Sequence, residues 1–345
     1  MKAFINVPMG AAGSDFVVEK TVRYLEGVCE TAYNKLDRVM TAEEVAEVIG
    51  DADAYVTGWG STALTKTILD AAPNLKLLVH LGGSVFDYVT PEMWDRGIRV
   101  VSGNDIMAES VAEATLCYTL AAYRDLPRIC NEMKTKGSWR TYHPLGWMNR
   151  GLRGKTVGVI SYGAVAKHFV RMLQPFAVNI RVYDIKSVPE EDKAKYGITQ
   201  VSLEEIFKDS DIVSLHTPLN DKTYRMIGKE HFAMMKDRAL FVNTARGAVI
   251  DEEALIEELK TGRICAALDV YDTEPLDKES PLRGLPNTLL MPHMAGPTYD
   301  LRSYTTEALL TEAAAYVDRG EELRSEISRQ MAEGMTRSAS KIVKS

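Results

Sequence analysis

The sequence has few cysteines and no long apolar stretch. Its 345 residues include four cysteines, Cys29, Cys117, Cys130 and Cys265, and none of them belongs to a C-x-x-C pair. This scatter indicates neither a zinc site nor a disulfide framework, so we expect no bound metal and a reducing cytoplasm. No apolar run approaches the roughly 18 residues that a membrane-spanning helix needs. The N-terminal run MKAFINVPMG is strand-like and does not have the pattern of a signal peptide.

An excess of basic residues is absent as well. Lysine and arginine total 41 against 48 acidic residues, which gives a net charge of −7. The chain therefore lacks the excess of basic residues that binds phosphate groups, and nucleic acid is not expected as a partner. The hydrophobic share of 46% and the charged share of 26% are those of a globular protein. Because 345 residues exceed what one core usually holds, two domains are expected.

Short β-branched or apolar runs alternate with helical patterns along most of the chain. The runs that read as strands are 2–7, 53–58, 76–80, 98–101, 156–160, 180–183, 211–215, 239–243, 264–268 and 287–291. Such alternation predicts parallel sheets that helices cover on both faces. The expected fold class is therefore α/β, with two doubly wound domains and about six strands in the second.

Two helices carry capping signals. The capping box Ser110-Val111-Ala112-Glu113 predicts the start of a long, mostly apolar helix that ends near Leu126 and is buried all round. A core helix within one subunit and a subunit interface explain this pattern equally well. Asp251 caps a second helix over 252–260, and the acids of its first turn suit the helix dipole. No catalytic role is expected for 251–253.

The stretch 155–184 has the order strand, tight turn, helix, strand, acid. This is the βαβ unit that binds a dinucleotide, because unpaired N–H groups at the helix start can hold a pyrophosphate. Asp184 ends the second strand, where a carboxylate accepts hydrogen bonds from a ribose 2′-hydroxyl and repels a 2′-phosphate. The cofactor predicted from this unit is NAD.

The glycine fingerprint of this unit is incomplete. Its G-x-G-x-x-G positions run from Ser161 to Ala166, so Gly163 is kept while Ser161 replaces the glycine of the tight turn. An ordinary βαβ turn without a ligand would explain the motif alone, but the flanking strands and Asp184 favour a dinucleotide. The predicted NAD contacts of this turn are Tyr162, Gly163, Ala164 and Val165.

Three polar segments follow the later predicted strands, at 243–247, 269–275 and 292–296. In open α/β sheets ligands bind beyond the carboxyl ends of the strands, so a cation, a carboxylate and an imidazole are expected to meet there. Reduction of a carbonyl needs a hydride donor, a proton donor for the developing alkoxide and a cation for the acid group. An arginine grips a carboxylate bidentately, and an imidazole oriented by a carboxylate donates a proton.

Five segments, in this order, resemble the D-isomer-specific 2-hydroxyacid dehydrogenases, which include phosphoglycerate dehydrogenase and glyoxylate/hydroxypyruvate reductases. They are GKTVGVI at 154–160, HTPLNDKT at 216–223, NTARGAVIDEEAL at 243–255, LDVYDTEPL at 268–276 and PHMAG at 292–296. The resemblance implies a Rossmann NAD-binding domain inserted into a flavodoxin-like substrate domain. The implied substrate domain comprises residues 1–104 plus 298–345, and the implied dinucleotide-binding domain comprises 105–297.

The same resemblance implies roles for individual residues. It implies that Arg246 binds the carboxylate and keto group of the substrate, that Glu274 supports the imidazole, and that His293 is the general acid/base. The further implied NAD contacts are Thr217, Pro218, Thr244, Ala245, Asp269 and His293. The implied amide cradle for the substrate carboxylate comprises Gly82, Gly83 and Ser84. His80 stands where many relatives have arginine, which argues against a phosphorylated substrate.

The resemblance thus implies an NAD-dependent dehydrogenase of a small 2-keto or 2-hydroxy acid, working as a homodimer. A formate dehydrogenase is rejected, since that enzyme carries glutamine where this chain has Glu274. The rival from another class is an NAD(H)-sensing binding protein, because the family also includes transcriptional corepressors that keep the same residues. A turnover assay separates an enzyme from a sensor.

Overall fold

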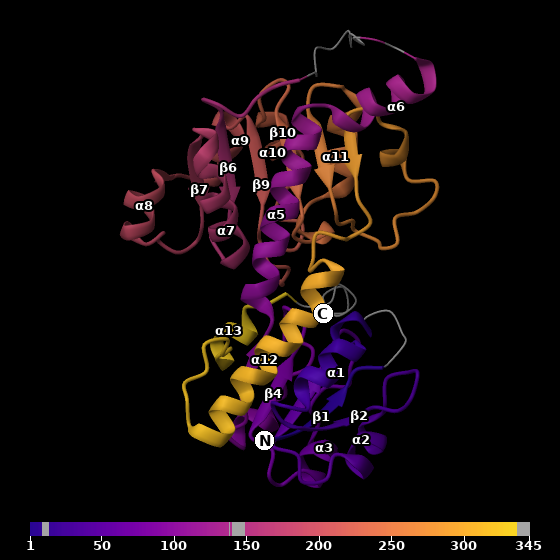
Figure 1. The fold of residues 1–345 in the computed structure, drawn as a ribbon. Coiled ribbons are helices and arrows are strands. Elements are labelled where there is room, and N and C mark those ends of the chain that lie inside the picture. The colour runs from indigo at the N-terminus through magenta and orange to yellow at the C-terminus, as the bar shows by residue number, and fades with distance from the viewer. Residues whose placement is uncertain (9–13, 138, 140–148, 337–345) are drawn as a thin grey trace. The chain divides into compact units, whose positions relative to one another are not determined.

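The computed structural model describes residues 1–8, 14–137, 139 and 149–336, and the chain forms two compact units (Figure 1). The first unit combines Met1–Met107 with Pro297–Ser345, and the second is Ala108–Gly296. Each unit is an α/β structure built on a parallel sheet, which confirms the predicted fold class. The segment 139–150, whose polar and aromatic sequence favours a loop before the dinucleotide-binding unit, lies almost entirely outside the described residues.

The first unit holds a parallel sheet with the order β2-β1-β3-β4-β5 among its described residues. Its elements are β1 (Lys2–Asn6), the 3-10 helix η1 (Ser14–Phe16), α1 (Glu19–Leu25), β2 (Glu30–Tyr33), α2 (Ala42–Val48), β3 (Ala54–Thr57), α3 (Lys66–Ala71), β4 (Leu77–His80), α4 (Pro91–Asp95), β5 (Arg99–Ser102), α12 (Tyr299–Arg319) and α13 (Arg329–Glu333). This strand order is that of flavodoxin-like sheets.

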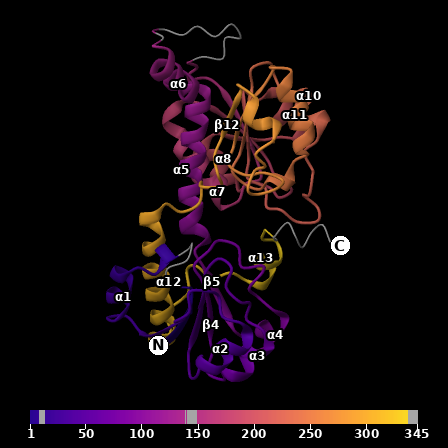
Figure 2. The same cartoon turned by 90° about the vertical axis from the view of Figure 1, so that its right-hand side faces the viewer.

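Successive residues of β1, β3, β4 and β5 pack into two different cores, as the alternation of side chains requires. Phe4 of β1 lies in the core beneath α2 and α3, whereas Ile5 lies in the core beneath α1 and α12. Tyr55 and Val56 of β3 divide in the same way. Figure 2 shows α1 and α12 on one side of the sheet and α2, α3 and α4 on the other.

The second unit holds a larger parallel sheet, with the order β12-β11-β10-β9-β6-β7-β8 in the described residues. Its elements are α5 (Asn104–Tyr123, which starts in the range of the first unit), α6 (Leu126–Lys136), β6 (Thr156–Ile160), α7 (Ala164–Leu173), η2 (Gln174–Phe176), β7 (Asn179–Tyr183), α8 (Glu190–Tyr196), β8 (Ile198–Gln200), α9 (Leu203–Asp209), β9 (Ile212–Leu215), α10 (Lys229–Met234), β10 (Leu240–Asn243), η3 (Gly247–Val249), α11 (Glu252–Lys260), β11 (Cys265–Leu268), η4 (Pro281–Gly284) and β12 (Thr288–Leu290). The order reverses between β6 and β9, and such a switch point is where Rossmann sheets bind ligands.

The prediction for the long helix is wrong at its start. The helix α5 begins at Asn104, and Ser110 lies inside it, where its buried hydroxyl donates a 3.1 Å hydrogen bond to the carbonyl of Gly296. One face is buried, with Ala112 and Tyr118, while Glu113 is exposed. The helix also ends at Tyr123, and a separate amphipathic helix, α6, follows it.

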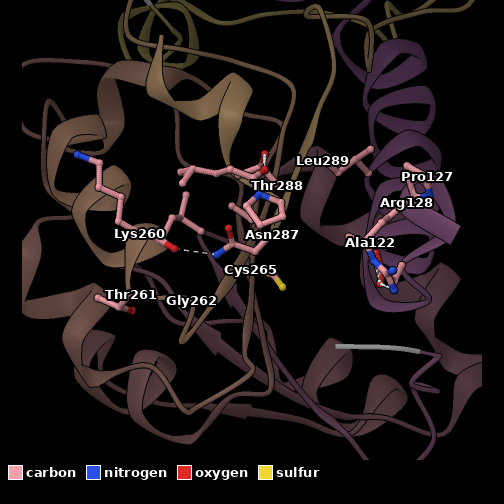
Figure 3. Close-up of a pocket in the computed structure, with 15 residues that line it drawn as sticks. Ala122, Pro127, Arg128, Lys260, Thr261, Gly262, Cys265, Asn287, Thr288 and Leu289 are labelled. Carbon is pink, nitrogen blue, oxygen red and sulfur yellow. Dashed lines mark hydrogen bonds and ion pairs between the residues drawn. The ribbon is translucent and has the colours of Figure 1, made fainter. Parts of the chain in front are cut away.

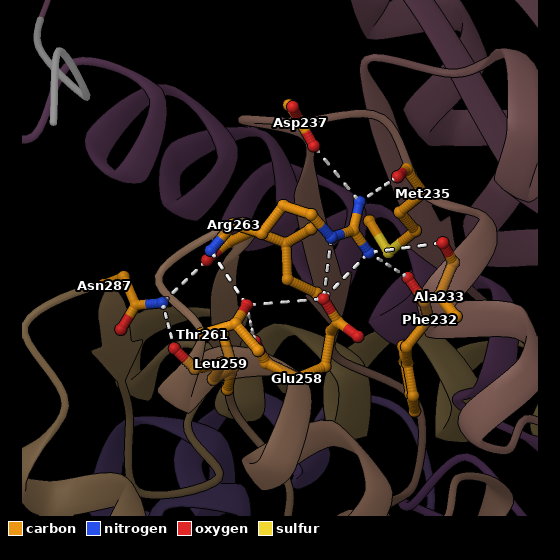
Figure 4. Close-up of polar contacts among 10 residues, drawn as sticks. Phe232, Ala233, Met235, Asp237, Glu258, Leu259, Thr261, Arg263 and Asn287 are labelled. Carbon is orange, nitrogen blue, oxygen red and sulfur yellow. Dashed lines mark hydrogen bonds and ion pairs between the residues drawn. The ribbon is translucent and has the colours of Figure 1, made fainter.

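A partly buried network around Arg263 connects the helices on one face of the second sheet. Arg263 precedes β11, and its guanidinium donates to the carbonyls of Phe232, at 2.8 Å, and Met235, at the end of α10 (Figure 4). The same guanidinium pairs with Glu258 of α11 at 2.8 Å. One cation therefore satisfies the terminal carbonyls of α10 and links this helix to α11, which begins next to the candidate active site.

Candidate active site

The chemistry-bearing loops of the second unit follow the carboxyl ends of its strands. Residues 161–163 follow β6, Asp184 follows β7, 216–218 follow β9, 244–246 follow β10, 269–274 follow β11 and 291–295 follow β12. The strands are parallel, so these segments lie along one edge of the sheet. Among the described residues, no group of three histidine, cysteine, aspartate or glutamate side chains is arranged to hold a metal.

Ser161 occupies the first glycine position of the fingerprint and adopts a glycine-like conformation. Its φ is +73°, in the left-handed region that costs a non-glycine residue roughly 1–2 kcal/mol. Its hydroxyl forms a 2.8 Å hydrogen bond with Oγ1 of Thr217, in the loop after β9. This hydrogen bond joins the two loops at the switch point and offsets part of the backbone strain.

The start of α7 has the properties of an anion site. No side chain caps it at Gly163, and within the described ranges the backbone N–H groups of Gly163, Ala164 and Val165 donate no hydrogen bond. A Cβ at Gly163 would meet nothing within 4 Å, so the space beside its Cα is open. Free donors at the positive end of a helix dipole fit the pyrophosphate of NAD.

Asp184 is held by the backbone around it. Its Oδ2 accepts a 2.7 Å hydrogen bond from the N–H of Tyr162, and its Oδ1 accepts one of 2.7 Å from the N–H of Lys186. A carboxylate has about four acceptor positions, so two remain for a ribose hydroxyl. The side chain of Tyr162 is buried at 7% exposure, which leaves the backbone of this residue as its contribution to the turn.

The other predicted NAD contacts lie at the same edge. Thr217 is buried beside the strand end at Ile160, and Pro218 follows it. Thr244 shares a 2.7 Å hydrogen bond with Thr115 of α5, and the N–H of Ala245 donates to Asn243 Oδ1 at 3.0 Å. These bonds fix the loop after β10, which also carries Arg246.

His293 and Glu274 form a close pair. Nδ1 of His293 lies 2.6 Å from Oε2 of Glu274, and the two side chains are 45% and 35% exposed within the described chain. Oε1 of Glu274 accepts a 3.1 Å hydrogen bond from the N–H of Tyr271, so both carboxylate oxygens are engaged. Burial raises the pKa of Glu274, but the contact with His293, the Tyr271 N–H and the charge of Arg246 outweigh it and leave the pKa below its usual value.

Arg246 lies within electrostatic reach of this pair. Burial lowers the pKa of its guanidinium, and the charge of Glu274 opposes this shift. Nη1 donates to the carbonyl of Ala245 at 2.5 Å. The remaining guanidinium N–H groups have no acceptor in the part of the chain that the structure describes. Free donors of this planar group are suited to a carboxylate.

Asp269 holds the loop that carries His293. Its two oxygens accept hydrogen bonds from the N–H groups of Met294 and Ala295, both at 2.9 Å. The residue is 1% exposed, and burial raises its pKa, while these two hydrogen bonds oppose the shift. His293 itself has a φ of +52°, an uncommon value for a non-glycine residue. The carboxylate thus stabilises the strained turn that presents the imidazole.

Close backbone packing brings Arg246 to the Glu274 loop. A Cβ added at Gly247 would lie 1.9 Å from the carbonyl carbon of Tyr271 and 2.5 Å from the backbone nitrogen of Asp272. The Tyr271–Asp272 peptide therefore lies directly on Gly247, and no other residue fits there without displacing this backbone.

A cavity of about 680 Å³ lies beside the pair. Glu274, Arg283, Met291 and His293 are among its lining residues, so both members of the pair face open space. A second cavity, of about 280 Å³, lies at the opposite ends of the strands, where β11 and β12 begin (Figure 3). There the amide of Asn287 already donates to two backbone carbonyls, at 3.0 and 2.7 Å. The first cavity therefore belongs to the candidate active site and the second does not.

The predicted substrate cradle lies in the first unit, after β4. In the described residues, the backbone N–H groups of Gly82, Gly83 and Ser84 donate no hydrogen bond, and the Ser84 hydroxyl donates to the carbonyl of Thr336 at 2.7 Å. A Cβ at Gly82 would lie 2.4 Å from Nε2 of His80 and 2.9 Å from Nε1 of Trp59, so the close approach of these rings requires glycine.

His80 is a buried, neutral histidine. It is 1% exposed, its Nδ1 lies 2.9 Å from Thr57 Oγ1, and its ring stacks on Tyr88 with centroids 4.1 Å apart. Burial lowers its pKa to about 3. The imidazole therefore adds no positive charge beside Gly82 at neutral pH.

One residue that contacts the candidate site was missed in the sequence. The carboxylate of Glu252, at the start of α11, accepts a 2.9 Å hydrogen bond from the N–H of Asp272. In the sequence it reads as an ordinary acid of a first helical turn, because its partner lies 20 residues further along the chain. No local pattern could reveal this contact.

Comparison with known proteins agrees with this geometry. Residues 116–295 match the family model for the D-isomer specific 2-hydroxyacid dehydrogenase, NAD binding domain. The chain is 36% identical over 310 residues to D-3-phosphoglycerate dehydrogenase of Methanocaldococcus jannaschii, covering 89% of this chain and 57% of that protein. It is 33% identical over 282 residues to glyoxylate reductase of Korarchaeum cryptofilum, covering 80% of this chain and 83% of the relative. The solved structure of a glyoxylate reductase from Paecilomyes thermophila matches with a TM-score of 0.76 over 96% of this chain and 99% of that one, at 24% identity, and supports the fold alone.

The Rossmann sheet and the free donors at the start of α7 are typical of a dinucleotide-binding domain, and the matched family model is that of an NAD-binding domain of oxidoreductases. The chain belongs to the D-isomer specific 2-hydroxyacid dehydrogenase family, whose named members act on a CH–OH group. The predictions of this family and of NAD as cofactor are therefore confirmed. None of the described helices is long and apolar enough to cross a bilayer.

Proposed function

We propose that this chain reduces a small, unphosphorylated 2-keto acid to the D-2-hydroxy acid with NADH, and catalyses the reverse reaction with NAD. The observation that carries the proposal is the 2.6 Å contact between His293 and Glu274, with the free donors of Arg246 nearby. Bound NADH supplies the hydride that is transferred to C2 of the keto acid. The residues of the chain supply charge, orientation and the proton.

Arg246 is assigned to the substrate carboxylate and to polarisation of the neighbouring keto oxygen. Its free guanidinium donors support this role, because a planar fork matches a carboxylate. The backbone amides of Gly82, Gly83 and Ser84 are assigned to binding of the substrate carboxylate, as the family resemblance implies. Their N–H groups without partners in the described residues, and the steric need for glycine at position 82, support this assignment.

His293 is assigned to proton transfer. In the reduction, the protonated imidazole donates from Nε2 to the oxygen that becomes a hydroxyl, and in the oxidation the neutral imidazole accepts that proton. Glu274 lies on Nδ1, which supports its role in fixing the orientation of the ring and stabilising the imidazolium. Asp269 supports the same step by holding the loop through the Met294 and Ala295 amides.

A substrate without a phosphate fits the residues near the cradle. A phosphorylated substrate would require a cation there, whereas His80 is buried with its pKa lowered to about 3. One relative is a glyoxylate reductase, whereas the archaeal phosphoglycerate dehydrogenase acts on a phosphorylated acid, and the chain spans 57% of the length of the latter protein. Because His80 is uncharged, an unphosphorylated acid is favoured as the substrate.

An NADH-oxidation screen tests the proposal. The panel is glyoxylate, hydroxypyruvate, pyruvate, 2-ketobutyrate, phenylpyruvate and phosphohydroxypyruvate. The expected result is turnover with one or more of the unphosphorylated acids and a far lower kcat/KM with phosphohydroxypyruvate. Binding of NADH without turnover on any acid would favour the NAD(H)-sensing alternative, and a preference for phosphohydroxypyruvate would overturn the substrate class.

We also propose that the enzyme is a cytoplasmic homodimer. The apolar residues on the partly exposed side of α5 and the amphipathic α6, which buries none of its residues in the described chain, support a subunit interface. Four unpaired cysteines are consistent with a reducing compartment. Light scattering coupled to gel filtration tests the dimer, and a monomer at micromolar concentration would contradict it.

A further inference from the structure

The loop that carries Glu274 is held by a second carboxylate. The N–H of Tyr271 donates to Glu274, at 3.1 Å, and the N–H of the next residue, Asp272, donates to Oε2 of Glu252, at 2.9 Å. Two consecutive amides thus bind two different carboxylates. Hydrogen bonds to a charged acceptor are stronger than neutral ones, so both bonds restrain this loop.

The same peptide group is also fixed from another side. Gly247 lies directly against the carbonyl of Tyr271, where an added Cβ would be 2.0 Å from the oxygen. Arg225 pairs with the side chain of Asp272 at 3.1 Å, and its backbone N–H donates to the carbonyl of Ala248 at 2.9 Å. The N–H of Asp272 therefore cannot turn to another acceptor while these contacts hold.

We propose that Glu252 is a positioning residue for the His293–Glu274 pair, which rests on the proposed function. Glu252 touches neither His293 nor any reacting atom. It holds the Tyr271–Asp272 peptide on Gly247, and the preceding peptide, Val270–Tyr271, binds Oε1 of Glu274 through the N–H of Tyr271. Its place at the first residue of α11 makes the tie rigid, because Asp251 caps the helix through a 3.2 Å hydrogen bond from Ala254.

The charge of Glu252 belongs to the same electrostatic group as the pair. It is partly buried, and burial raises its pKa, as do the charges of Asp272 and Glu274, while the Asp272 N–H and Arg225 oppose the shift. The His293–Glu274 pair itself also faces the charges of Arg246 and Asp269, which every variant retains. Loss of the negative charge of Glu252 makes a proton on the His293–Glu274 pair less favourable. The pH at which reductase activity is half lost should therefore move to lower pH.

The chain offers a matched control. Glu253 is the next residue of the same helical turn, and it is exposed. Substitution of either glutamate removes the same charge from the helix start, so any helix-dipole effect is shared. Only substitution of Glu252 removes the hydrogen bond to the Asp272 amide.

The test compares the wild type with E252A, E252Q and E253A. For E252A we expect kcat to fall roughly 10- to 100-fold, as for loss of a hydrogen bond to a charged group, with the Kd for NADH within twofold. E252Q keeps an acceptor, so its kcat should recover most of this loss, with the alkaline midpoint of its kcat/KM profile at lower pH. E253A should match the wild type in kcat and in pH profile.

Hydrogen exchange of the protein without substrate gives a readout that does not depend on turnover. The amides of Tyr271 and Asp272 should exchange faster in E252A than in E253A. Equal exchange, together with a kcat of E252A within twofold of E253A, would overturn the proposal. If E252A does not fold, the pH profile of E252Q decides, and an unshifted midpoint overturns it.

Failure of this inference is distinguishable from failure of the proposed function. If the wild type is active and the kcat of E252A equals that of the wild type, only the positioning role of Glu252 is rejected and the proposed function stands. If none of the keto acids supports NADH oxidation by the wild type, the proposed function is rejected. The hydrogen-exchange experiment then still tests whether Glu252 restrains the loop.

Discussion

Asp269→Asn tests how the strained turn at His293 is held. The carboxylate is 1% exposed and accepts two amides, from Met294 and Ala295, each at 2.9 Å. Asparagine retains the shape but places an NH2 group against one of these N–H donors, so one hydrogen bond is lost. A hydrogen bond to a charged group contributes about 1.5–3 kcal/mol to stability. Since about 1.4 kcal/mol is a tenfold change in rate, kcat should fall roughly 10- to 100-fold.

The assay is steady-state NADH oxidation at a saturating keto acid, with the Kd for NADH measured by fluorescence. Asp277→Asn is the matched control, because Asp277 is an exposed acid that accepts one backbone N–H, from Glu279 at 2.8 Å. It should leave kcat unchanged. A kcat for Asp269→Asn within twofold of this control would refute the reasoning that the carboxylate holds the turn.

Three further predictions concern the cofactor turn, the cofactor preference and the buried histidine. Ser161→Ala keeps the strained φ and loses the 2.8 Å bond to Thr217, so it should lower the unfolding free energy by about 1 kcal/mol, whereas Ser161→Gly relieves the strain and should come close to the wild type in urea denaturation. Asp184→Ala should narrow the preference for NADH over NADPH in kcat/KM, and a wild type that prefers NADPH would contradict the ribose role. His80 has a pKa lowered to about 3 from roughly 6.5 in the unfolded chain, so its contribution to stability is present above pH 6.5 and is lost on acidification at about 1.4 kcal/mol per pH unit. Between pH 7.5 and 5.5 the free energy of unfolding of His80→Gln should therefore fall less than that of the wild type. Equal decreases in urea denaturation would contradict the lowered pKa of His80.

Much of the second unit could be predicted because its signals are local. The βαβ unit over 155–184 combines β-branched runs with a turn and an acid, and β6, α7 and β7 follow it closely. The segments that carry Arg246, Glu274 and His293 come directly after strands, and this alone places them on one edge of a parallel sheet. The register of β11 and β12 places the beginnings of the loops that carry Glu274 and His293 next to each other, and the contact itself depends on the paths of these loops.

Two of the misses have tertiary causes and one has a local cause. Ser110 has the local pattern of a cap, but its hydroxyl is bonded to Gly296, far along the chain, and the helix extends back to Asn104. The strand β8 has three residues, too few for a period-two pattern to be read. Glu252 has a sufficient local explanation as a first-turn acid, so its bond to the Asp272 amide could only be found in three dimensions.

Substitution of His293 by alanine, assayed at saturating NADH with the best keto acid of the screen, addresses the assignment of proton transfer most directly. The expected result is a kcat lower by roughly two to four orders of magnitude, with a much smaller change in the Kd for NADH, because the proton donor is removed while the donors at the start of α7 and the carboxylate of Asp184 are left. A variant that turns over at the rate of the wild type would contradict the assignment of the imidazole and, with it, the proposed mechanism.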